Sequence, residues 1–184
     1  PMSLSAADPI DEICSRGIVR DSDVIGLRKV LYGKSSIAAG DIEALFLIND
    51  RVRIQDPAWA SFFIEAVTDF LINELPPQGY ATAANANWLI ERIGRDGRVD
   101  SASELELLVN ILEQARWVPA PLVRIALDQV KQAVIAGDGP LRVGKQLKPG
   151  QISADEVALL RRVLYAFGGD GNAAITRLEA EVLF

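Results

Sequence analysis

The sequence predicts an all-α protein folded as a single compact domain of eight or nine helices. Apolar residues recur at helical spacing along most of the 184 residues, and no stretch shows the period-two alternation of a half-buried strand. One helix–loop–helix pattern also recurs along the chain, as expected of a duplicated unit. The composition agrees, because 49% apolar and 24% charged residues is the balance of an ordinary globular domain.

The repeat is clearest between residues 21–46 and residues 154–184. A shift of 133 positions aligns their first helices, so that residues 28–32 (RKVLY) fall on residues 161–165 (RRVLY). After the loop the shift becomes 138, since the later copy carries five extra residues. A weaker middle copy spans 85–112. Identities that stay in register over two helices indicate a duplication.

This pattern also predicts the domain organisation. We expect an N-terminal segment at residues 1–20, followed by one helical domain at 21–184. Within that domain the repeats lie near 21–84, 85–148 and 154–184, and the last of them is incomplete. A repeat that is incomplete needs a cap or a partner to cover its apolar face.

The first part of the domain contains three expected helices. Residues 21–32 have apolar side chains at helical spacing and end at Gly33, and residues 38–49 form the second helix. The third helix begins at the Asp-Pro pair at 56–57, where proline suits the first turn, and closes before the prolines at 76–77. Its apolar face is the broadest in the chain, which predicts a central, buried helix.

The second part continues the same pattern. Helices are expected at 83–93 and 101–116, and the latter follows the i, i+3, i+4, i+7 rule closely. Another helix runs from the prolines at 119–121 to about residue 134. A glycine-rich connector at 136–151 then leads to the helix that opens the last repeat.

Charge and rare residues exclude several functions. The formal net charge is −6 and no basic run occurs, so no nucleic-acid partner is expected. Histidine is absent and Cys14 is the single cysteine, which excludes His-dependent triads and zinc or iron sites built from these residues. No apolar stretch approaches the length of a membrane span and no signal-peptide pattern occurs, so we expect a cytoplasmic protein without membrane contact.

The loop at 168–179 is a candidate cation site. Asp170, Asn172 and Glu179 take the third, fifth and twelfth positions of a calcium-binding loop, where oxygen ligands are needed. Gly168 supplies no ligand at the first position. We therefore expect Ca²⁺ or Mg²⁺ to bind weakly there, and no other cofactor.

The middle copy offers a poorer set of oxygen ligands, Asp96, Asp100 and Glu104. Helix capping is the alternative explanation for the glutamates in both loops. The patterns Ser-x-x-Glu and Thr-x-x-Glu are capping boxes, in which hydroxyl and carboxylate satisfy the first amides of a helix; they occur at 101–104, 153–156 and 176–179. Helix starts need these residues whether or not a metal binds.

Two segments resemble a known family. The sequence DGRV at 96–99 with Glu104, and DG at 170–171 with Ile175 and Glu179, resemble the acidic loops of the tellurite-resistance TerB-like family. The resemblance implies a compact, acidic, all-helical and non-enzymatic protein linked to stress response and divalent-cation binding. The chain departs from the pattern by a longer final loop and a one-residue shift of Glu104, which affect the metal ligands more than the fold.

From these observations we expect a non-enzymatic acidic helical module that acts through a protein partner or as a homo-oligomer. The alternative is a carboxylate-dependent hydrolase with an oxygen-ligated metal, which needs two or more acids converging in a deep pocket. The two functions predict different surfaces, a deep cleft lined by acids for the enzyme and an exposed groove or acidic patch for the binding module.

Overall fold

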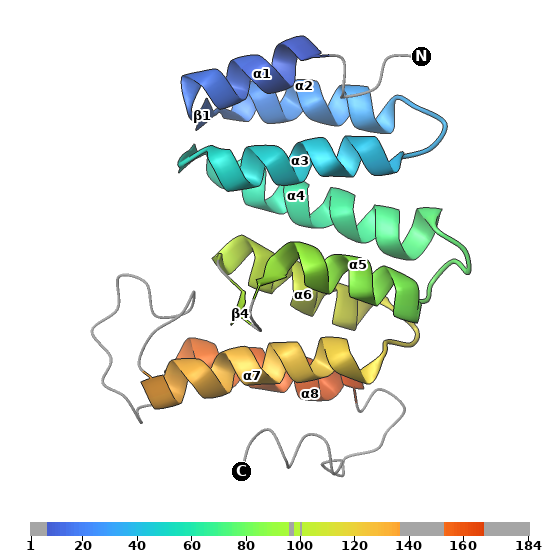
Figure 1. Ribbon diagram of the computed structural model, residues 1–184, viewed down its shortest axis with the longest axis vertical. Helices are drawn as coiled ribbons and strands as arrows, with labels where there is room; N and C mark the ends of the chain where they lie inside the picture. The colour runs from blue at the N-terminus through green and yellow to red at the C-terminus, as the bar shows by residue number, and fades with distance from the viewer. Residues whose placement is uncertain (1–6, 96–97, 100, 137–152, 168–184) are drawn as a thin grey trace. The chain divides into compact units, whose positions relative to one another are not determined.

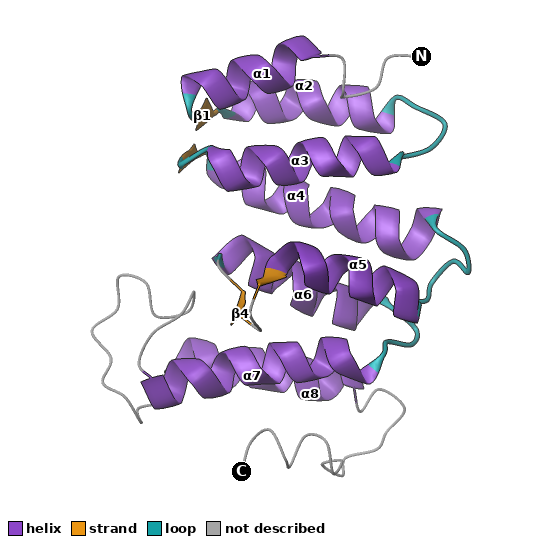
Figure 2. Cartoon of the chain, viewed as in Figure 1, coloured by secondary structure: helices purple, strands orange, loops and turns teal. Residues whose placement is uncertain are grey.

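The structure is a computed structural model that describes residues 7–95, 98–99, 101–136 and 153–167. It is 77% helical, which confirms the all-α prediction (Figure 2). The chain divides into two compact units, unit 1 (residues 1–78) and unit 2 (residues 79–184). The boundary lies close to the predicted limit between the first two repeats, and the single domain predicted over 21–184 stays a prediction.

Unit 1 consists of two helix hairpins stacked on each other. In chain order its elements are α1 (Ala7–Arg16), β1 (Ile18–Val19), α2 (Asp21–Tyr32), α3 (Ala39–Arg51), β2 (Ile54–Gln55), α4 (Pro57–Thr68) and the π-helical turn η1 (Asp69–Glu74). α1 packs on α3 and α2 packs on α4, so corresponding helices of the two hairpins form two layers (Figure 1). The predicted N-terminal segment thus contains a helix and a strand of unit 1.

The loops of the two hairpins are also joined. β1 and β2 form a parallel ladder of two residues, with Ile18 opposite Ile54 and Val19 opposite Gln55. The amide of Asp56 donates to the carbonyl of Val19 at 2.9 Å. This ladder corrects the prediction that strands are absent. A two-residue strand is too short to show the alternation by which strands are recognised, so the sequence could not reveal it.

Aromatic side chains form the core of unit 1. Trp59, Phe62 and Phe63 of α4 are fully buried, and the ring of Phe63 meets that of Phe46 edge to face with centroids 5.1 Å apart. The indole Nε1 of Trp59 donates to Asn49 Oδ1 at 3.1 Å, so its polar atom keeps a partner inside the core. These contacts confirm the prediction that the helix after residue 57 is a central one.

Charged and polar groups link α2 to α4 and η1. Arg28 forms an ion pair with Glu65 at 2.8 Å, and its guanidinium carbon lies 5.2 Å from the centre of the Phe62 ring. The hydroxyl of Tyr32 donates to Asp69 Oδ2 at 2.6 Å. Partial burial, followed by this hydrogen bond, raises the pKa of the Tyr32 phenol well above its ordinary value of 10.0, although the residue is 39% exposed.

Unit 2 repeats the arrangement of unit 1. Its elements are α5 (Ala83–Ile93), β3 (Gly94–Arg95), β4 (Arg98–Val99), α6 (Ala102–Gln114), α7 (Ala120–Ala136) and α8 (Ala154–Phe167). α5 packs on α7 and α6 packs on α8, which again gives two layers, and α7 also contacts α6 and α8. β3 and β4 form a short antiparallel ladder, the second pair of strands that the sequence analysis missed.

Leucine and valine dominate the core of unit 2. The stripe predicted on the helix at 101–116 is buried as expected, with Leu105, Leu108, Val109 and Leu112 all 2% exposed or less. A hydrogen bond joins α7 to the segment before α6. The buried amide of Val99, in β4, donates to the side chain of Gln129, in α7, at 3.0 Å. None of the described helices is long and apolar enough to cross a membrane.

The predicted repeat corresponds to real helix–loop–helix units where the structure describes it. Residues 21–46 lie on α2 and α3, and the middle copy, 85–112, lies on α5 and α6. The first helix of the copy at 154–184 is α8, and its second half lies outside the described residues.

Candidate functional site

The predicted capping boxes occur at the starts of α6 and α8. The amide of Ser153 donates to Glu156 Oε1 at 2.8 Å, while the amide of Glu156 donates to Ser153 Oγ at 3.1 Å, which is a reciprocal capping box. At the start of α6, Ser101 Oγ accepts from the amide of Glu104 at 3.2 Å and donates to the Glu104 carboxylate at 2.8 Å. The capping prediction is therefore confirmed at these two starts, and residues 176–179 lie outside the described part.

Two further carboxylates, Asp41 and Asp23, accept hydrogen bonds at the starts of α3 and α2, where the capping residue is not a serine. The amide of Ala38 donates to Asp41 Oδ2 at 3.0 Å, and the amide of Arg20 donates to Asp23 Oδ2 at 2.9 Å. Lys34 neutralises the fully buried Asp41 at 2.6 Å. An acid that receives an amide of the first helical turn stabilises the helix and its dipole, so these groups are explained by folding alone.

The predicted cation ligands are only partly described by the structure. Glu104 is 5% exposed and belongs to the cap of α6. Asp96, Asp100, Asp170, Asn172 and Glu179 lie outside the described residues. Within the described part, no three acids or cysteines gather closely enough to hold a metal ion. Weak binding of Ca²⁺ or Mg²⁺ in the terminal loop stays a prediction.

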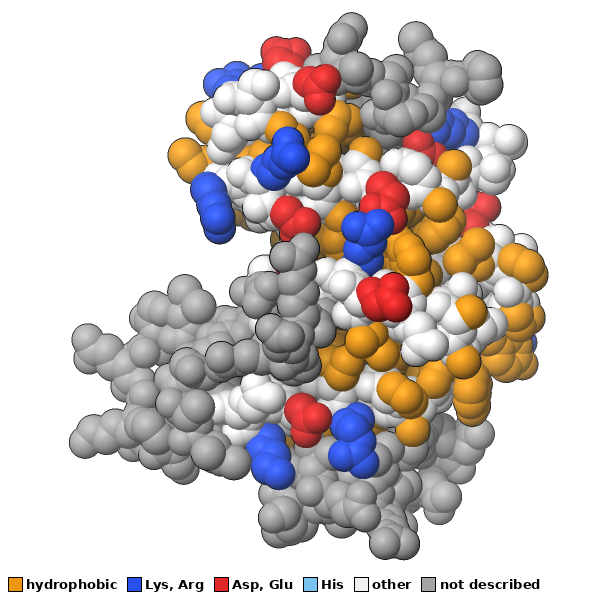
Figure 3. All heavy atoms as spheres, in the orientation of Figure 1, with side chains coloured by type: hydrophobic (Ala, Val, Ile, Leu, Met, Phe, Trp, Pro, Cys, Tyr) orange, Lys and Arg blue, Asp and Glu red, His pale blue; other side chains and the backbone are white. Residues whose placement is uncertain are grey.

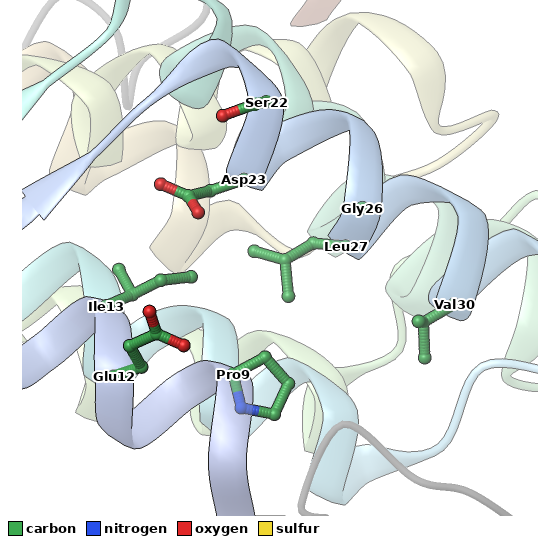
Figure 4. A pocket seen from close by; sticks show the side chains of 8 residues that line it. All are labelled: Pro9, Glu12, Ile13, Ser22, Asp23, Gly26, Leu27 and Val30. Atoms are coloured by element: carbon green, nitrogen blue, oxygen red, sulfur yellow. The ribbon is translucent and has the colours of Figure 1, made fainter.

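Among the residues that the structure describes, a groove between α1 and α2 of unit 1 has room for a ligand. It encloses about 250 Å³, and Figure 4 shows the side chains that line it. The buried Ile13 of α1 and Leu27 of α2 point toward each other and form its floor. The remaining lining residues are Pro9 and Glu12 of α1, and Ser22, Asp23, Gly26 and Val30 of α2.

Gly26 keeps the groove open. It lies in the middle of α2, where glycine costs about 1 kcal/mol relative to alanine. A Cβ at this position would meet nothing within 4 Å, so no close contact within the fold requires a glycine. Four residues later, one turn along the helix, comes Val30, which is 39% exposed although it lies on the same side of the helix. Together the two positions leave an apolar channel on α2.

An ion network closes one end of the groove. Arg16 Nη2 lies 2.5 Å from Asp23 Oδ2, and Arg16 Nη1 lies 3.6 Å from Glu12. The same guanidinium donates to the carbonyl of Ile18 at 3.3 Å. Because Asp23 also holds the start of α2, the network fixes α1, β1 and α2 to one another. The site is thus preformed, with an apolar floor and a charged end.

Exposed apolar side chains lie elsewhere on the chain as well. In unit 2, Tyr80 and Trp117 form a short parallel bridge between two loops, and Trp117 is 56% exposed. In unit 1, Ile25 and Ile54 are more than half exposed. Figure 3 shows apolar side chains reaching the surface between charged ones. The α1–α2 groove combines apolar lining residues with a cavity.

The sequence analysis did not find the groove. Its expectation of an exposed groove for a binding module was general, and it proposed no residue of α1 or α2 as part of such a groove. The sequence did contain one sign of it, which is Gly26. Under the shift of 133 residues this glycine aligns with Leu159, so a large apolar side chain of the later copy is missing from the first.

Comparison with known proteins adds no identification, since no family model, no curated protein and no solved structure matches the chain.

Proposed function

We propose that the protein is a non-enzymatic helical module that binds a segment of a partner protein in the α1–α2 groove. The observation that carries this proposal is the preformed groove with its floor of Ile13 and Leu27 and its opening at Gly26. An apolar channel of this kind suits the apolar face of a peptide helix.

The architecture supports the proposal. Each unit is a stack of two helix hairpins, and stacked helix pairs form the extended surfaces that helical-repeat proteins use for binding. The buried acids Asp41 and Glu156 accept from the amide of the residue that caps their helix, and Glu104 accepts from the hydroxyl of Ser101, which caps α6. Their burial is accounted for by stabilisation of the fold, without a catalytic role.

The resemblance to the TerB-like family belongs to the same proposal. It agrees with an acidic, all-helical module that works through a partner inside the cell, and it adds weak binding of a divalent cation by the loop that contains Asp170. The cation and the groove are separate features, because the groove residues belong to α1 and α2 alone.

Photo-crosslinking in cells that make the protein tests the proposal. A benzophenone amino acid at position 26 would lie in the groove, and one at Ser61, which is exposed on α4, serves as the matched control. We expect protein adducts from position 26 and none of the same mass from position 61. The absence of adducts at position 26, with adducts at position 61, would place the binding surface elsewhere.

A further inference from the structure

We draw no further inference here: the strongest candidate, the exposed aromatic pair of Tyr80 and Trp117 on the parallel bridge between two loops of unit 2, carries none because nothing in the structure shows what covers it.

Discussion

Replacing Gly26 by alanine tests whether the groove is open in solution. The residue is in the interior of α2, and a Cβ would meet nothing within 4 Å. Gly26→Ala should therefore raise the free energy of unfolding by the difference in helix propensity alone, about 1 kcal/mol. If unit 1 unfolds on its own, this corresponds to a rise in Tm of about 4–8 °C for a domain of its size.

Gly33 provides a matched control with the opposite expected sign. It follows α2 directly, and a Cβ there would lie 2.6 Å from the carbonyl oxygen of Lys29, which requires the backbone to shift. Gly33→Ala should therefore destabilise the protein, by about 1–3 kcal/mol if the cost is that of overpacking. The same chemical change then stabilises at one glycine of the helix and destabilises at the other.

Urea unfolding measures both variants. Tryptophan fluorescence, to which the fully buried Trp59 of unit 1 contributes, and far-ultraviolet circular dichroism should report the unfolding. The two variants should shift the urea midpoint in opposite directions with an unchanged slope. If Gly26→Ala lowers stability as Gly33→Ala does, another part of the chain covers this face of α2 and the argument for an open groove is wrong.

Four further predictions concern a helix cap, the partly buried phenol of Tyr32 and the cation. Ser153→Ala should cost about 1 kcal/mol by removing the acceptor for the Glu156 amide, measured by urea unfolding. Because the pKa of Tyr32 is raised, its contribution to stability is complete below pH 10.0 and is lost progressively above it, so unfolding at pH 9 and pH 11 should differ more in the parent than in Tyr32→Phe. Removing the negative charge of the acceptor with Asp69→Asn should lower the pKa of this phenol, seen by absorbance titration of the phenolate. Asp170→Ala should leave metal-free stability unchanged and abolish any heat of Ca²⁺ or Mg²⁺ binding in calorimetric titration, and a signal that survives would exclude the terminal loop as the cation site.

Features that depend on neighbouring residues could be predicted from the sequence. A Ser-x-x-Glu pattern places its acceptor and donor within one helical turn, so the caps at Ser101 and Ser153 follow from local geometry. The helices follow from apolar spacing, and the buried position of Phe62 and Phe63 follows from the breadth of that apolar face.

Features that depend on how helices pack could not be predicted in the same way. The β1–β2 ladder joins Ile18 to Ile54, which are far apart in the sequence, and two residues give no alternation to recognise. The groove exists because α1 packs on α3 and α2 on α4, which leaves a channel between α1 and α2 at Gly26. A glycine in a helix does not reveal whether a neighbouring helix fills the space beside it.

Photo-crosslinking from position 26, compared with position 61, tests the central claim most directly. The account predicts protein adducts from position 26 and none of the same mass from position 61. Adducts from position 61 alone, or from neither position, would contradict the assignment of the α1–α2 groove as a binding site.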